Sequence, residues 1–187
     1  MESHLRVTLL RHAQIHEDFE GAYNGHNDIG LSSLGLTQAQ ELKDELNMDL
    51  FDAIYCSDLR RTKDTLHAFY KDDSIIYTQK IREKSWGRHE GLNYDQIVVM
   101  EGQDYQDFTQ WLALLDGEPY DKFIGRIKEF FFDFLPRQKH EEVLVVTHSG
   151  VIRILFHLLE KISLTEALSR KVPYASLTKI TLSKELI

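Results

Sequence analysis

Two histidines in this 187-residue chain each come at the end of a run of apolar and β-branched residues. The run 7–10 leads into Arg11 and His12, and the run 143–147 leads into His148. Such runs are typical of strands buried on both faces of a parallel sheet, and open α/β sheets bind ligands at the carboxyl ends of their strands. Either histidine alone would more often be a hydrogen-bonded structural residue. The repetition favours one crevice in which both histidines act on a ligand.

Further charged residues lie where they could join that crevice. Arg60 and Arg61 follow the apolar run 53–56 and are either surface groups or anion binders, and Glu83 lies in a loop that contains Gly87 and Gly91. The chain has no G-x-S-x-G turn, no Walker-type glycine loop before a lysine and no Cys/His spacing typical of zinc. Arginine side chains match phosphate oxygens, and a neutral imidazole can accept a phosphoryl group covalently. These residue types therefore indicate phosphoryl chemistry.

The elements that must position these groups alternate between strands and helices. Short apolar runs predict strands at 7–10, 52–56, 74–77, 143–147 and 177–182. Apolar residues at helical spacing predict helices at 34–48, 121–135 and from 151 onward, and one or two helical pieces within 93–115. We expect a three-layer α/β/α sandwich around a mostly parallel sheet, formed by a single domain over residues 1–187.

The stretch 121–135 is the clearest amphipathic helix of the chain. Its aromatic residues Phe123, Phe130, Phe131 and Phe134 recur at helical spacing. We expect this stripe to form core rather than to contact a cofactor.

The composition limits the partners and the compartment. The formal net charge of −8 argues against nucleic acid or an anionic membrane as the main partner. Cys56 is the only cysteine, so no disulfide can form within the chain. The first strand begins within a few residues of Met1, and no apolar run approaches the roughly 20 residues of a membrane span. We expect a cytoplasmic protein. A homodimer is compatible with the sequence.

Five segments resemble, in the same order, motifs of the histidine phosphatases, the superfamily of cofactor-dependent phosphoglycerate mutase. Residues 11–13 match R-H-G/A, residues 31–39 resemble P-L-T-x-x-G-x-x-Q-A, and residues 57–65 resemble S-x-L-x-R-A-x-x-T. Residues 83–91 resemble E-x-x-F-G-x-W-E-G, and residues 146–153 resemble V-x-H-G-G-V-I-R. Together the five matches span nearly the whole chain.

The resemblance implies a role for each candidate catalytic residue. His12 would be the nucleophile and would form a phosphohistidine, while Arg11, Arg61 and His148 would bind the phosphoryl oxygens. Glu83 would protonate the leaving oxygen and then take a proton from the hydrolytic water. The resemblance implies no cofactor and no metal, because the arginines supply the positive charge.

Further details bear on the substrate. Residues 21–26 resemble the G-L-Y-S-G-H segment of the α-ribazole phosphatase branch, so we expect Asn24, Gly25 and Ser149 to contact a small phosphorylated metabolite, with α-ribazole phosphate as one candidate. The segment that encloses the bisphosphate in the longer mutases has no match here. A phosphatase is therefore favoured over two alternatives: a phosphoglycerate mutase-type phosphoryl transferase, or a weakly active protein that binds phosphorylated ligands.

One residue departs from the family pattern in a way that concerns the phosphate. Asp18 stands where relatives usually have an asparagine. A carboxylate beside the phosphate would repel the substrate dianion, so we expect the change of Asp18 to asparagine to raise kcat/KM unless the side chain faces away.

Overall fold

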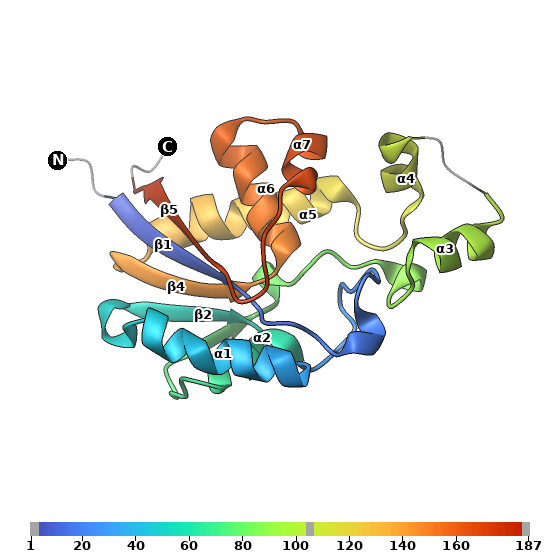
Figure 1. Ribbon diagram of the computed structural model, residues 1–187. Helices are drawn as coiled ribbons and strands as arrows, with labels where there is room; N and C mark the ends of the chain where they lie inside the picture. The colour runs from blue at the N-terminus through green and yellow to red at the C-terminus, as the bar shows by residue number, and fades with distance from the viewer. Residues whose placement is uncertain (1–3, 104–106, 185–187) are drawn as a thin grey trace.

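The computed structural model describes residues 4–103 and 107–184, and its centre is one five-stranded sheet (Figure 1). The strand order is β3-β2-β4-β1-β5. Strands β1, β2, β3 and β4 run parallel, and β5 pairs antiparallel with β1. The strands are β1 (His4–Arg11), β2 (Ala53–Ser57), β3 (Ile76–Thr78), β4 (Glu142–Thr147) and β5 (Leu177–Ser183). The expected mostly parallel sheet is confirmed.

Seven α-helices surround the sheet in the described residues. They are α1 (Ser33–Glu45), α2 (Arg60–His67), α3 (Tyr94–Glu101), α4 (Phe108–Leu114), α5 (Tyr120–Lys128), α6 (Ser149–Glu160) and α7 (Leu164–Ser169). The side chain of Ser32 caps α1 by accepting the N–H of Gly35, 2.9 Å away. No helix in the described ranges is both long and apolar enough to cross a membrane.

The two faces of the sheet carry separate cores, which follows from the alternation of side chains along a strand. On β4, Val143 and Val145 pack on the face covered by α5 and α6, whereas Leu144 and Val146 pack against α1 and α2. Figure 1 shows these helices on opposite sides of the strands. The α/β/α sandwich predicted from the sequence is therefore confirmed.

The predicted helix 121–135 is interrupted. After α5 the backbone widens into a π-helical segment at Glu129–Phe134 and then tightens into a 3₁₀ turn at Leu135–Arg137. The wider turn delays the helical phase by about one residue. As a result Leu135 is fully buried where regular spacing would place Phe134, and Phe134 is 41% exposed. The prediction that Phe134 belongs to the core stripe was wrong for this reason.

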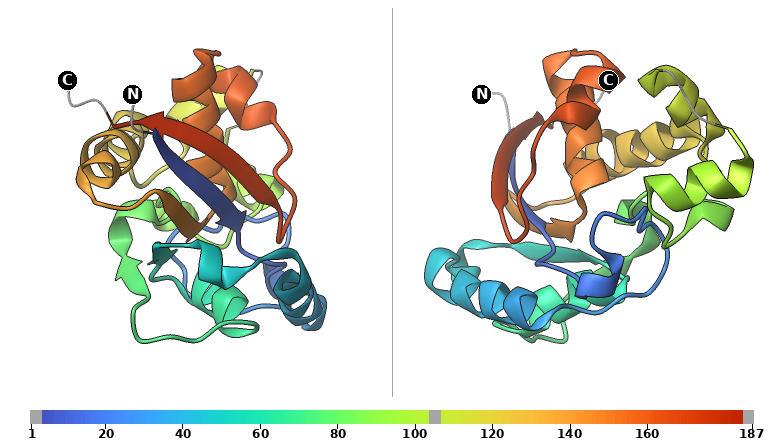
Figure 2. Two further views of the ribbon diagram at one scale, coloured as in Figure 1. Left: turned by 90° about the vertical axis from the view of Figure 1, so that its left-hand side faces the viewer. Right: turned by 45° about the vertical axis from the view of Figure 1, so that its right-hand side comes forward.

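Helices α3 and α4 extend the molecule beyond the carboxyl ends of β1 and β4 (Figure 2). They correspond to the helical pieces predicted within 93–115, of which residues 104–106 lie outside the described residues. A small separate core of Ile97, Trp111 and Leu115 holds them together. They overhang the sheet edge where the strand-end histidines lie.

The topology places a crevice between β1 and β4. These strands are neighbours, but the chain leaves β1 toward α1 on one face and leaves β4 toward α6 on the other. Such a switch point opens a gap at the carboxyl ends of the two strands. His12 and His148 follow these two strands and therefore flank the gap.

Replacement of Phe131, which is fully buried in the α5 and α6 core, should lower the free energy of unfolding. A cavity left by a buried phenylalanine costs about 3–5 kcal/mol, and we expect that loss for Phe131→Ala in urea unfolding. Phe134→Ala is the matched control, because its ring is 41% exposed and should cost much less. Equal losses in the two variants would contradict the shifted helical phase.

Candidate active site

His12 presents one nitrogen to a cavity at the end of β1. Its Nδ1 lies 2.8 Å from the carbonyl oxygen of Ala13. Because a carbonyl only accepts, Nδ1 carries the proton and donates, and Nε2 of the neutral ring keeps its lone pair. Burial holds the pKa of His12 well below its usual value, and the charges of Arg61 and Arg11 lower it further. His12 is therefore a neutral imidazole with a nucleophilic nitrogen.

His148 lies behind His12, with the two ring centroids 5.2 Å apart. Its Nδ1 accepts a hydrogen bond from Nε of Arg61 at 3.2 Å, so its Nε2 carries the proton and donates to Oγ of Ser57 at 2.8 Å. Burial and the nearby Arg61 hold its pKa well below the usual value. Both nitrogens are paired within the protein, and the ring is fully buried. In this structure His148 orients Arg61 rather than lining a cavity.

Arg61 comes from the first turn of α2 and is 1% exposed. Besides His148, its guanidinium donates to the carbonyl oxygens of Gly25 at 2.7 Å, Asn27 at 3.0 Å and Asn24 at 3.4 Å. Burial lowers its pKa to about 10, so the group stays charged at neutral pH. The loop 24–27 is thus folded around one buried positive charge.

Arg11 supplies a second cation, which is partly buried. Its guanidinium stacks on the ring of Tyr174 at 3.9 Å and donates to the carbonyl oxygen of Val172. Its Nε–H is buried and has no acceptor in the part of the chain that is described. Leaving a buried donor unpaired costs about 1–3 kcal/mol, and an anion in the adjoining cavity would remove that cost.

Glu83 is positioned by contacts to the segment that carries it. Arg126 of α5 donates to the carbonyl oxygens of Arg82 and Glu83 at 2.8 and 2.9 Å, and Thr147 Oγ1 donates to the carbonyl of Ile81 at 2.8 Å. The same Arg126 is held by a bidentate contact with Glu118. These bonds fix the backbone of residues 81–83 against α5 and β4.

The Glu83 carboxylate is itself held by two backbone groups. Its Oε1 accepts the N–H of Lys84 at 3.0 Å, and its Oε2 accepts the N–H of Gly150 at 2.9 Å. A Cβ on Gly150 would lie 2.0 Å from Oε1, so only glycine leaves room for the carboxylate there. The first turn of α6 therefore orients Glu83.

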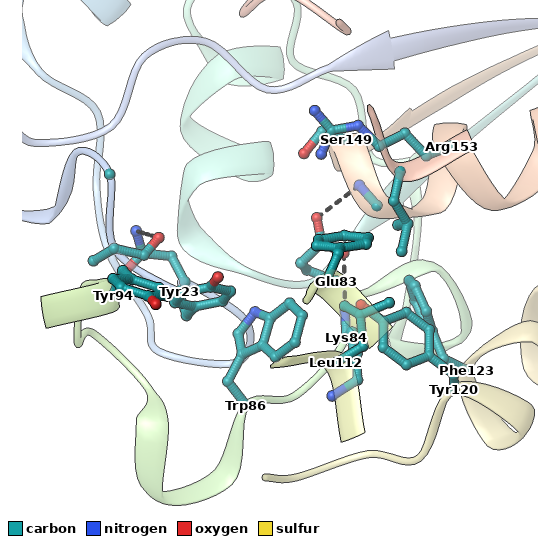
Figure 3. A pocket seen from close by; sticks show the side chains of 16 residues that line it. Tyr23, Glu83, Lys84, Trp86, Tyr94, Leu112, Tyr120, Phe123, Ser149 and Arg153 are labelled. Carbon is teal, nitrogen blue, oxygen red and sulfur yellow. Dashed lines mark hydrogen bonds between the residues drawn. The ribbon is translucent and has the colours of Figure 1, made fainter. Parts of the chain in front are cut away.

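Two adjoining cavities meet at Glu83. The smaller has a volume of about 100 Å³, and its polar lining includes Arg11, His12 and Arg61. The larger has a volume of about 400 Å³ and is lined mainly by aromatic and apolar side chains (Figure 3). Glu83 and Ser149 line both. The smaller space suits a phosphate-sized anion and the larger the organic part of a ligand, with Glu83 at the junction.

The structure also places the three residues expected to contact substrate. Ser149 and Asn24 line both cavities, but the Asn24 amide donates to the carbonyls of Phe19 and Ala22. Gly25 is buried and lines neither cavity. Its carbonyl oxygen binds Arg61 instead. Gly25 and the Asn24 amide thus shape the loop.

Glu90 fixes that loop from the other side. Its carboxylate accepts the N–H groups of Gly25, His26 and Trp86, at 2.8, 2.8 and 2.9 Å. One carboxylate therefore joins the loop that holds Arg61 to the segment that carries Glu83. Within the resemblance Glu90 was only part of a motif, and its role could not be read from spacing.

Asp18 faces away from the site. Its side chain is 81% exposed and lies 3.4 Å from Nδ1 of His16. It does not line the small cavity that contains His12. The expected repulsion between Asp18 and a bound phosphate is therefore absent from this geometry.

Several cavity residues were not identified from the sequence. Tyr174 follows a proline in a connection without a motif, yet it supports Arg11 and lies 5.8 Å from the His12 ring. Arg153 and Lys84 line the larger cavity with Trp86 and Tyr120.

Among the described residues, no cluster of three or more His, Cys, Asp or Glu side chains has a geometry suited to a metal ion.

Comparison with known proteins agrees with this geometry. The sequence profile of the histidine phosphatase superfamily (branch 1) matches residues 7–186. The adenosylcobalamin/alpha-ribazole phosphatase of Escherichia coli is 26% identical over 156 residues, which cover 81% of this chain and 77% of that protein. A metal-independent phosphoserine phosphatase of Arabidopsis thaliana is 28% identical over 158 residues, covering 80% and 66%.

The fold is also shared with solved structures. The alpha-ribazole phosphatase from Shigella flexneri superposes with a TM-score of 0.81 at 23% identity, covering 94% of this chain and 89% of that chain.

Gly150→Ala should displace Glu83, because the new Cβ would overlap Oε1. A misplaced general acid typically costs 10²–10⁴ in rate, so we expect kcat/KM for an aryl phosphate to fall by roughly 100-fold or more. Gly125→Ala in α5 is the control, since a Cβ at Gly125 would meet no atom within 4 Å. Wild-type turnover by Gly150→Ala would show that the Glu83 position is not needed.

Stability should fall as pH decreases below about 6.5, because His12 and His148 are buried and neutral in the folded state but protonate freely when unfolded. Below that pH the unfolded chain binds more protons, and each histidine lowers the free energy of unfolding by up to about 1.4 kcal/mol per pH unit. Urea unfolding between pH 7 and pH 5.5 measures the slope. His12→Asn should reduce it by about half, and an unchanged slope would contradict burial of a neutral His12.

Proposed function

The chain belongs to the histidine phosphatase superfamily, branch 1, and from this membership we propose a metal-independent phosphomonoesterase that acts through a phosphohistidine on His12. The observation that carries the proposal is the orientation of the His12 ring, which is fixed by its hydrogen bond to Ala13. Its Nδ1 donates to Ala13, which leaves the nucleophilic Nε2 for a small cavity lined by Arg11 and Arg61.

In the first step the phosphoryl group of the substrate occupies the small cavity. Nε2 of His12 attacks phosphorus, the ester P–O bond breaks, and a proton from Glu83 goes to the leaving oxygen. Glu83 lies at the junction of the two cavities, where that oxygen must pass. The released alcohol then leaves through the larger cavity.

In the second step water attacks phosphorus from the side that the alcohol has left. Glu83, now ionised, takes a proton from this water, the P–N bond to His12 breaks, and inorganic phosphate is released. The same carboxylate serves both steps because it faces the same side of the phosphoryl group throughout.

A buried guanidinium, that of Arg61, and a partly buried one, that of Arg11, supply the positive charge for this reaction. The unpaired Nε–H of Arg11 is available to a phosphoryl oxygen, and Arg61 places its charge beside the cavity. His148 acts through Arg61, whose Nε–H it accepts. Because these groups are fixed before substrate arrives, little reorganisation is needed as charge develops.

The natural substrate is a small phosphorylated metabolite. A 400 Å³ cavity with Tyr23, Trp86 and Tyr120 in its lining is larger than a three-carbon alcohol requires and suits a ring-bearing one. α-Ribazole phosphate, after which the Escherichia coli relative is named, and phosphoserine, after which the Arabidopsis thaliana relative is named, are the first compounds to compare.

Hydrolysis of 4-nitrophenyl phosphate in excess EDTA tests the mechanism. We expect wild-type turnover to persist in the chelator and to fall at least about 1,000-fold in His12→Ala, because His12 is the one histidine among the described residues that line the small cavity. Asp18→Asn is the matched control and should change kcat/KM less than about two-fold, since Asp18 is exposed and outside the cavity.

The outcomes separate the alternatives. Loss of activity in EDTA would refute the metal-independent mechanism. Stimulation by a bisphosphate, with phosphoryl exchange between positions of one substrate, would identify a mutase. Binding of phosphorylated ligands without any turnover would identify a binding protein.

A further inference from the structure

We propose that the alcohol part of the substrate carries a carboxylate and that Arg153 binds it. This inference rests on the proposed phosphatase reaction and narrows its substrate class. Among ring-bearing phosphomonoesters, the site would select those of hydroxy acids over those of neutral alcohols.

Arg153 lies one turn after Ser149 on α6 and lines the larger cavity. Its Nε donates to the carbonyl oxygen of Arg170 at 2.8 Å, which fixes the plane of the guanidinium. In the described residues its two terminal nitrogens have no hydrogen-bond or ion-pair partner. Figure 3 shows the side chain extending from α6 toward Ser149. Two free, coplanar N–H₂ groups are the arrangement that binds a carboxylate bidentately.

A second cation lines the same cavity. The Nζ of Lys84 lies 4.0 Å from the centroid of the Trp86 ring and donates to the carbonyl oxygens of Ser85 and Asp116 at 3.1 and 3.3 Å. No carboxylate of the described residues lies within ion-pair distance of it. Lys84 therefore adds to the positive potential that Arg153 creates at the wall of the larger cavity.

The charges around the two cavities do not balance. Arg11, Arg61, Lys84 and Arg153 line them, against Glu83 as the one carboxylate among the described residues of the lining. The chain as a whole has a net charge of −8, so this excess of positive charge is local.

Two other partly buried arginines of the structure are each paired with a carboxylate. Arg82 is paired with Asp58 and Arg126 with Glu118. A phosphoryl dianion would compensate the two arginines of the small cavity, which leaves Glu83 as the one carboxylate of the described lining against Lys84 and Arg153. An excess of positive charge in a partly desolvated site favours an anionic ligand.

The position of Arg153 also indicates where the carboxylate lies. Arg153 shares the cavity wall with Ser149 and Gly150, and Gly150 donates to Glu83. A carboxylate at Arg153 therefore lies near the ester oxygen, and the ring of the substrate extends toward Trp86 and Tyr120.

Two aryl phosphates of nearly equal shape test the inference: 3-carboxyphenyl phosphate and 3-carbamoylphenyl phosphate. They differ in the charge of one substituent. We expect wild type to prefer the carboxylate ester by about ten-fold in kcat/KM, mainly through KM, and Arg153→Met to reduce that ratio to near one. Arg153→Lys, which keeps the charge but loses the planar fork, should give an intermediate ratio.

Arg137→Met is the matched control, because it removes the same charge from an exposed position on another surface. It should keep the wild-type ratio. An equal kcat/KM for the two esters in wild type would overturn the inference, while turnover of both would uphold the phosphatase. If neither ester is turned over, the proposed function fails. Calorimetric binding of the two esters to His12→Ala then decides the inference separately, with equal affinities refuting it.

Discussion

The site depends on one buried guanidinium, that of Arg61. A cation that is 1% exposed must have its N–H groups satisfied, and the protein provides His148 and three carbonyl oxygens of the loop 24–27. The loop 24–27 in turn depends on Arg61, because three of its carbonyl oxygens accept hydrogen bonds from the guanidinium. Removing Arg61 would therefore release the loop from its position as well as weaken phosphate binding.

The same loop is held on its other side by a partly buried carboxylate, that of Glu90. The Glu90 carboxylate accepts the N–H of Gly25, whose carbonyl oxygen binds Arg61. The peptide segment thus bridges a cation and an anion that do not touch. Glu90 also accepts the N–H of Trp86, which lines the larger cavity. One carboxylate therefore connects the loop that positions Arg61 in the small cavity to a wall of the larger one.

Much of this arrangement could be predicted from the sequence because it follows from short-range rules. Apolar runs ending in His12 and His148 predicted two strands of a mostly parallel sheet, and the structure shows these strands as parallel neighbours. The crevice expected between the two histidines contains His12, whereas His148 lies behind it and does not line the cavity. Phe134 was wrongly predicted to lie in the core, because the spacing of apolar residues does not reveal a π-helical turn. Asp18, expected beside the phosphate, faces away from it, and neither Tyr174 nor Arg153 was predicted to line the site. The direction of a loop or helix-surface side chain depends on contacts between segments distant in the chain, which spacing does not show.

The division between the two cavities explains how such a site can keep its chemistry while changing its substrate. The nucleophile and the two arginines of the small cavity come from the end of β1 and the first turn of α2, where the sheet fixes them against their neighbours. The larger cavity is walled in part by α4, α5 and the segment around Trp86, which belong to the long connection between β3 and β4. Substitutions in that connection can alter shape and charge without moving His12, because the two regions share few residues besides Glu83, Ser149 and Asn24. Arg153 is the exception, since it is on α6 yet faces the variable side. The guanidinium of Arg153 can therefore bind the alcohol part of the substrate, while its backbone belongs to the same helix that orients Glu83.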